Sequence, residues 1–461
     1  MQNITTICGA FKAFYSIGLL VFSIVIIMGI IATKETELSH KVSPSIAFSA
    51  LWVAIICLSV IEGSLASLIG LAPVDREIYK DSHPIAYKIT SIVHEGDNLQ
   101  RYIIGRQFMV VLIVFVVNMS GAPVQGAELW GYPPIVVDIF LGSGLAMILF
   151  TCMVGQLNSQ VNASHCMLDF INNYFALFLF SVAMMIEISG LLHVSYLVQM
   201  LVSWLSKKPV ESKEEHRNLG QNTLFFGRCL MSLAILIFCF IVTLEALFRG
   251  QTTLWKCVPS YVAVTVFFVL MPILGMLEAS HIAFFAAAKL RSSERGDSYF
   301  AMKTCEVLFN GEGLNLPAFM IGRQLCVVSC MLFVARVTSI DTKGGENIFG
   351  VPDGVQALLN TGFLGALIVT ITGSIVWQLV AAAFPIAFLN NPITYTLLHL
   401  CLSLEKTGIC AGAWILALTH KKLAGFNRDE VYIGTADERA EIAMAVNRHL
   451  LEENSISSDC V

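Results

Sequence analysis

Two stretches of the chain, Glu95–Gln107 (EGDNLQRYIIGRQ) and Glu312–Gln324 (EGLNLPAFMIGRQ), share one pattern. In both, a Glu-Gly-x-Asn element is followed at the same spacing by Gly-Arg-Gln, and the second copy lies 217 positions after the first (95 to 312). Each copy places glycines and charged groups at the start of a long apolar segment. The duplication predicts a chain built from two related halves.

The similarity between the halves extends beyond these stretches. Glu62 precedes the first copy by 33 residues (62 to 95), and Glu278 precedes the second by 34 (278 to 312). Downstream, a set of residues recurs at a constant offset of 218: Gln160, Ala163, Phe170, Asn172, Asn173, Glu187 and Gly190 return as Gln378, Ala381, Phe388, Asn390, Asn391, Glu405 and Gly408.

The composition indicates an integral membrane protein. Hydrophobic residues make up 56% of the chain and charged residues 13%, and the mean hydropathy is +0.73. Soluble domains carry roughly 25% charged residues, so the chain is far outside their range. The net charge of −5 is weak and distributed, which gives no indication of nucleic-acid binding.

A helix that crosses a bilayer needs about 20 mostly apolar residues, and we count ten such stretches. They run near 11–33, 45–72, 101–118, 135–155, 174–198, 224–248, 258–287, 318–335, 355–384 and 393–418. Five fall in each half, and this odd number makes the second half enter the membrane from the opposite side. The predicted fold is an all-α integral membrane protein with ten transmembrane helices in two inverted five-helix repeats.

The expected domain organisation follows from this count. Residues 1–202 form the first repeat, 203–222 a polar linker, 223–419 the second repeat, and 420–461 a charged C-terminal tail with one helix-like run over 437–453. We expect both termini on the cytoplasmic side, because the tail is charged and the first apolar stretch lacks the features of a signal peptide.

Four glutamates lie within apolar segments: Glu62, Glu187, Glu278 and Glu405. A carboxylate in hydrocarbon is costly unless it is paired, protonated or in contact with water, so such residues are candidates for coupling to an ion. The alternative is a glutamate near a helix end that reaches the membrane interface.

The Glu-Gly-x-Asn elements are expected to interrupt helices, because Gly96 and Gly313 destabilise a helix interior. Backbone groups released by a break need protein, water or a ligand as partners. The alternative is an ordinary junction between loop and helix, with Asn98 and Asn315 as caps. Duplicated, interrupted segments in corresponding halves are typical of transporter binding sites.

The Gly-Arg-Gln elements, which contain Gly105 and Gly322, suggest how such a site is organised. Arg106 and Arg323 are predicted to pair with Glu95 and Glu312, because arginine suits buried carboxylate pairs. Carboxamides both donate and accept hydrogen bonds, as a neutral polyhydroxy solute requires. The carboxamides predicted to contact the solute are Asn98, Gln107, Gln160, Asn315, Gln324 and Gln378.

A metal site and an enzyme are both disfavoured. His165, Cys166 and Asp169 lie within five residues of one another, but structural zinc takes four ligands and no second cluster completes the set. The repeats contain no nucleophile-and-base set or nucleotide loop. We therefore predict neither a structural metal nor a cofactor.

The paired Glu-Gly-x-Asn and Gly-Arg-Gln motifs, one pair in each half, resemble those of the eukaryotic silicon (silicic acid) transporters. Gly155-Gln156-Leu157 and Cys166-Met167-Leu168-Asp169 are similar to the diatom branch. The resemblance covers about residues 10 to 420. Two features depart from the family pattern: Asn98 and Asn315 replace Gln, and the tail lacks sustained heptads.

The resemblance implies sodium-coupled uptake of orthosilicic acid across the plasma membrane, with Na⁺ as the coupling ion and no other cofactor. It also implies that the duplicated residues line or support the site: Glu95, Gly96, Asn98, Gly105, Arg106 and Gln107, with Glu312, Gly313, Asn315, Gly322, Arg323 and Gln324. The alternatives are transport of another small hydroxylated solute, such as boric acid, and a passive channel.

Overall fold

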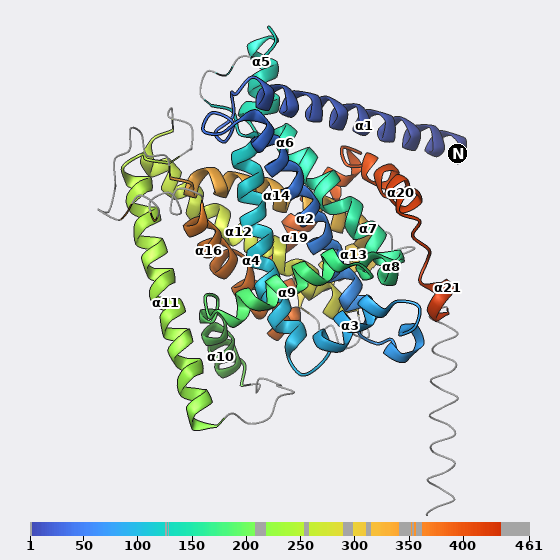
Figure 1. Ribbon diagram of the computed structural model, residues 1–461, viewed down its shortest axis with the longest axis vertical. Coiled ribbons are helices and arrows are strands. Elements are labelled where there is room, and N and C mark those ends of the chain that lie inside the picture. Colours follow the sequence, from blue (N-terminus) through green and yellow to red (C-terminus); the bar gives the residue numbers. More distant parts are fainter. Residues whose placement is uncertain are drawn as a thin grey trace, which may run out of the picture.

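The computed structural model describes residues 2–124, 127, 129–207, 218–252, 258–288, 298–309, 315–340, 352, 355 and 362–434 (Figure 1). Within these ranges the regular structure is helical, with two isolated β-bridges and no strands. The expected helix-like run over 437–453 and the residues Glu312 and Gly313 lie outside the described residues.

The described part of the first half contains ten helices and three short turns of 3₁₀- or π-helix. They are α1 (Gln2–Ala32), α2 (Pro44–Leu71), η1 (Arg76–Tyr79), α3 (Pro84–Val93), α4 (Asn98–Gly121), α5 (Pro134–Val137), η2 (Asp138–Gly142), α6 (Leu145–Phe150), η3 (Thr151–Leu157), α7 (Asn158–His165), α8 (Met167–Ile171), α9 (Tyr174–Ile188) and α10 (Val194–Ser206).

The described part of the second half follows the same order. Its elements are α11 (Leu219–Phe248), α12 (Ser260–Ala288), α13 (Tyr299–Phe309), α14 (Asn315–Thr338), α16 (Phe363–Thr370), η6 (Ile371–Ile375), α17 (Val376–Ala383), α18 (Pro385–Leu389), α19 (Pro392–Lys406) and α20 (Gly412–Ala424). A short helix, α21 (Glu430–Ile433), follows in the tail.

The predicted count of ten transmembrane helices is not confirmed. In the described ranges seven helices are long and apolar enough to cross a membrane, or eight if the bent pair Pro134–Gly142 and Leu145–His165 forms one span. The stretches predicted near 174–198 and 393–418 are each divided into two short helices. The divisions contain Gly190 (φ +84°) and Gly408 (φ +75°), a left-handed conformation that glycine adopts readily and that ends a helix.

Matching asparagines form equivalent hydrogen bonds in the two halves. The side chains of Asn173 and Asn391 accept a backbone N–H at the starts of α9 and α19. Asn172 accepts backbone N–H groups at the start of α3, and Asn390 accepts that of Phe300 at the start of α13. The recurring Asn-Asn pair therefore serves as a pair of helix caps.

The contacts between the halves are reciprocal around a central pair, α4 and α14. α14 packs against α6 and η3, and correspondingly α4 packs against α16 and η6. The same exchange holds at the periphery: α20 contacts α1 and α7, whereas α10 contacts α11 and α17. Contacts exchanged in this way are the mark of an isologous, two-fold-like interface.

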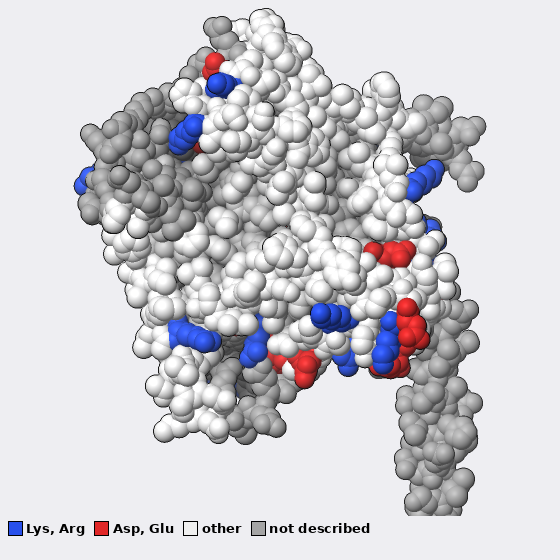
Figure 2. Space-filling model, viewed as in Figure 1, with Lys and Arg blue, Asp and Glu red and all other residues white. Residues whose placement is uncertain are grey.

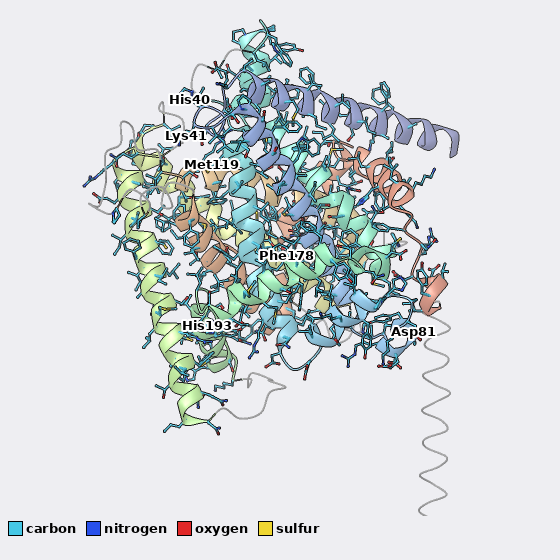
Figure 3. The ribbon with its side chains drawn as sticks, viewed as in Figure 1. His40, Lys41, Asp81, Met119, Phe178 and His193 are labelled. Carbon is cyan, nitrogen blue, oxygen red and sulfur yellow. The ribbon has the colours of Figure 1, made fainter. Side chains whose placement is uncertain are left out.

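The surface fits a lipid environment. Large apolar side chains are exposed on several helices, among them Phe14 (79%), Tyr174 (78%) and Phe178 (58%). Charged residues on the visible face gather along its lower edge, at its upper left and along its right-hand side, and uncharged surface covers the centre (Figure 2). His40 and Lys41 lie toward one end of the molecule, Asp81 lies toward the other, and Phe178 lies between them (Figure 3). The protein is therefore a membrane protein of several apolar helices.

Candidate functional site

The first polar centre forms around Glu62, which lies on α2 in an otherwise apolar segment. Arg106 Nη1 on α4 lies 3.4 Å from Glu62 Oε2. Gln160 Nε2 on α7 donates to the same oxygen at 3.2 Å. Arg106 Nη2 also donates to Oε1 of its neighbour Gln107 at 2.8 Å. Three separate helices thus bring a carboxylate, a guanidinium and two carboxamides together.

The second centre repeats this arrangement with the matching residues. Arg323 Nη1 on α14 lies 3.9 Å from Glu278 Oε2 on α12, and Gln378 Nε2 on α17 donates to that oxygen at 3.4 Å. Arg323 Nη2 donates to Gln324 Oε1 at 2.8 Å, as Arg106 does to Gln107. The repeated motifs therefore build two equivalent polar centres.

A glutamine from the first half joins the two centres. Gln324 Nε2 donates to Gln156 Oε1 on η3 at 2.6 Å, and Gln156 Nε2 lies 3.5 Å from Glu62 Oε1. The two Gly-Arg-Gln elements thus belong to one site at the contact between the halves.

Both centres are buried and contain arginine donors with no hydrogen-bond partner in the described structure. Arg106 and Arg323 are each 5% exposed, and in both residues Nε and Nη1 form no hydrogen bond. A buried donor is costly to leave unsatisfied, so the great majority of such groups have a partner. The same two atoms recur in each half.

Glycine at positions 105 and 322 allows the site helices to pack closely. A Cβ on Gly105 would overlap the backbone carbonyl oxygen of Ala183 on α9, and a Cβ on Gly322 would overlap that of Cys401 on α19. A backbone oxygen cannot rotate away as a flexible side chain can. The glycine of each Gly-Arg-Gln element therefore allows the close helix packing that sets the position of the adjacent Arg and Gln side chains.

The predicted partner of Arg106 was wrong. Glu95 is exposed in the turn between α3 and α4, and Arg106 pairs with Glu62 instead. Eleven positions of mostly helical chain separate Glu95 from Arg106, whereas α2 packs directly against α4. Arg323 likewise pairs with Glu278, and its predicted partner Glu312 lies outside the described residues.

In the first half the Glu-Gly-x-Asn element lies in the turn between two helices, which agrees both with the predicted interruption and with the alternative of a junction at the start of a helix. α3 ends at Val93, α4 begins at Asn98, and Gly96 between them has φ +55°. Asn98 Nδ2 donates to the Ile92 carbonyl at 2.9 Å, and Asn315 Nδ2 donates to the Val307 carbonyl at 2.6 Å. The two asparagines thus tie α4 and α14 to the short helices that precede them, at some distance from the polar centres.

Glu187 and Glu405 stand at the ends of α9 and α19. Glu187 is buried, and its Oε1 accepts a hydrogen bond from the Tyr196 hydroxyl on α10 at 2.8 Å. Glu405 is partly buried one residue before α19 ends. Both therefore lie beside the Gly190 and Gly408 turns and not in the polar centres.

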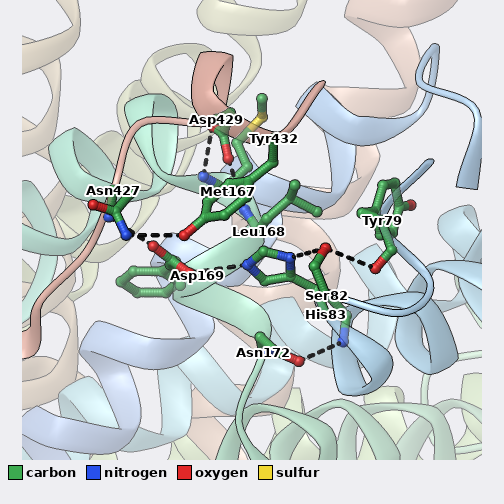
Figure 4. A network of polar contacts seen from close by, with 12 residues as sticks. Tyr79, Ser82, His83, Met167, Leu168, Asp169, Asn172, Asn427, Asp429 and Tyr432 are labelled. Atoms are coloured by element: carbon green, nitrogen blue, oxygen red, sulfur yellow. Dashed lines mark hydrogen bonds and ion pairs between the residues drawn. The ribbon is translucent and has the colours of Figure 1, made fainter. Parts of the chain in front are cut away.

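The Cys166–Asp169 segment fastens the C-terminal tail to the first half (Figure 4). Asp429 accepts the backbone N–H groups of Met167 and Leu168 at 2.8 and 2.9 Å, which caps α8. Asp169 accepts the Asn427 N–H at 2.6 Å and lies 3.0 Å from His83 Nε2. Among the described residues no group of three metal-ligating side chains forms.

Sequence reasoning treated Gln156 only as part of a family motif and missed its place in the site. Gln156 is fully buried and precedes Gln160 by one helical turn, so both face α2. A spacing of four residues places two side chains on one helix face, and this signal was present in the sequence. The π-helical turn η3 that carries Gln156 was not predictable from the same pattern.

A buried polar centre shared by two matching halves, inside a bundle of apolar helices, is typical of a membrane transport protein. The family model for silicon transporters matches residues 4–456, so the chain belongs to the silicon transporter family. No curated protein and no solved structure matches the chain.

Proposed function

We propose that this protein carries orthosilicic acid across the plasma membrane together with Na⁺, by alternating access between two inverted five-helix halves. Residues 1–202 and 223–419 form the halves, 203–222 the linker and 420–461 the tail. Membership of the silicon transporter family supports the substrate.

The observation that carries the proposal is the set of unsatisfied arginine donors in two equivalent, charge-balanced centres. Glu62 lies beside Arg106, and Glu278 beside Arg323, so the arginines are paired and do not form a site for an anion. What the centres offer is buried N–H donors and carboxamides. A small neutral hydroxide, whose oxygens accept and whose hydroxyls donate, fits this set.

The contacts suggest a division of labour among the site residues. Gln107 and Gln324 would contact the solute hydroxyls, and Arg106 and Arg323 would orient these glutamines while donating to the solute through Nε and Nη1. Gln160 and Gln378 would hold the glutamates. We assign Asn98 and Asn315 to supporting α4 and α14, because their amide groups are bonded to α3 and α13.

The inverted arrangement is supported by the reciprocal contacts between the halves and by the matching order of their elements. A five-element half that is copied with opposite orientation gives such contacts about a two-fold axis in the membrane plane. Rocking of one half against the other would then open the shared centre to either side in turn.

Sodium would provide the driving force. A neutral solute gains nothing from the membrane potential, whereas each Na⁺ that moves with it contributes about 2.3 kcal/mol per 100 mV. We place the coupling on Glu62 and Glu278, which lie in the shared centre. Glu187 and Glu405 lie at helix ends, where a structural role is sufficient.

The test is uptake of radiolabelled germanic acid, a silicic acid mimic, into proteoliposomes with an inward Na⁺ gradient. We expect accumulation above the external concentration, and none when K⁺ replaces Na⁺. Variants Arg106→Lys and Arg323→Lys keep the charge but lose the planar donor set, and should reduce uptake at least tenfold. Equilibration without accumulation would indicate a channel, and stronger competition by boric acid than by silicic acid would indicate the other solute.

A further inference from the structure

The two halves of the site differ at one pair of matching positions. The π-helical turn η3 carries Gln156, and at the same offset (156 to 374) η6 carries Ser374. Gln156 extends across the interface and accepts a hydrogen bond from Gln324. The Ser374 hydroxyl instead accepts from Gln378, four residues later on its own helix, at 3.1 Å. The near-symmetry of the site is therefore broken at its centre.

Because of this difference, the side-chain carboxamides of Gln107 and Gln324 form different hydrogen bonds. Gln324 forms two hydrogen bonds, since its oxygen accepts from Arg323 and one N–H of its Nε2 donates to Gln156. The oxygen of Gln107 accepts from Arg106, but its Nε2 forms no hydrogen bond within the described part of the chain. One carboxamide is ready to donate to a solute, and the other is held by a protein group.

We propose that Gln156 is a positioning residue that holds the Gln324 carboxamide and competes with the solute for one of the two N–H groups of its Nε2. This inference rests on the proposed function and adds an order of events to it. The solute first meets Gln107, and it gains Gln324 only when the Gln156–Gln324 bond breaks. Because that bond joins the two halves, its breaking is tied to their relative movement.

The nearest-volume variant, Gln156→Met, removes both hydrogen bonds of the side chain with little change in packing. It should free Gln324 and lower the KM for germanic acid two- to tenfold, about the net value of one hydrogen bond. Gln156→Ser, which copies the second half, should shift KM in the same direction. Gln199→Met, on α10 and outside the polar centres, is the matched control and should leave KM unchanged.

A rise in KM would show that Gln156 binds the solute, and an unchanged KM would show that it does not compete; either result overturns the proposal. If a variant folds but does not transport, its Kd for germanic acid, measured by equilibrium binding to the purified protein, is compared with that of the wild type in place of KM. Absence of uptake by the wild-type protein would instead reject the proposed function.

The bond itself has a test that is independent of transport. A double-mutant cycle of Gln156→Met and Gln324→Met, followed by thermal unfolding in detergent, measures whether the two side chains interact. We expect the double variant to lose less stability than the two single losses combined. Strictly additive losses would show that the two glutamines do not interact, and would remove the basis of the proposal.

Discussion

Loss of Arg106 alone should destabilise the protein more than loss of its whole ion pair. Arg106 Nη1 lies 3.4 Å from Glu62 Oε2, and both side chains are about one-tenth exposed or less. At an effective dielectric constant near 20, unit charges at this distance attract by roughly 5 kcal/mol. Removing one partner of a buried pair leaves the other charge uncompensated, at a cost of about 3–5 kcal/mol. We therefore expect Arg106→Met to cost about 4 kcal/mol.

The double variant Glu62→Gln/Arg106→Met removes both charges and should recover most of that loss. Its new carboxamide oxygen can still accept the hydrogen bond that Gln160 now gives to Glu62. Thermal unfolding of the purified protein in detergent measures the stability, and germanic acid uptake measures the function. The double variant should be nearly as stable as the wild type and yet inactive, because the solute has lost the donors of Arg106 in one of the two centres.

The control is a shorter but exposed ion pair. Arg249 Nη2 lies 2.6 Å from Glu245 Oε1, and its side chain is 56% exposed. Exposed pairs contribute about 0–1 kcal/mol, so Arg249→Met should change stability little. If Arg106→Met is no more harmful than Arg249→Met, or if the double variant is as unstable as Arg106→Met, burial of an unpaired charge is not the cause.

Two further predictions concern packing and the tail. Gly322→Ala should cost about 2–3 kcal/mol and abolish uptake, because its Cβ would meet a backbone carbonyl on α19. Gly18→Ala on α1, where nothing lies within 4 Å, should be neutral or slightly stabilising in the same unfolding experiment, and equal effects would refute the packing argument. Asp429→Asn should loosen the tail from α8 and expose Cys166 beneath it. Burial raises the pKa of the Cys166 thiol, so alkylation at pH 8 should be slow in the wild type and about tenfold faster in the variant, as peptide mass spectrometry would show. An unchanged rate would mean that Asp429 does not hold the tail in place.

Sequence alone determined the class of the protein and its internal duplication. Long apolar stretches have few structures open to them in a bilayer, so the composition was sufficient to predict membrane helices. The duplicated motifs also identified Arg106, Gln107 and their matching residues as a set. Glu62 and Glu278 were predicted as candidates for coupling to an ion, because a carboxylate in an apolar segment is costly.

The tertiary structure decided which of these residues meet. Arg106 pairs with Glu62 on α2 and not with Glu95, because helix packing brings distant positions together while a helix holds near ones apart. The same packing places Gln156 of the first half within hydrogen-bond distance of Gln324 of the second, a contact that the sequence motif did not indicate. It also divided two of the expected spans at Gly190 and Gly408, since apolar composition fixes where a chain is buried but not whether its helix continues.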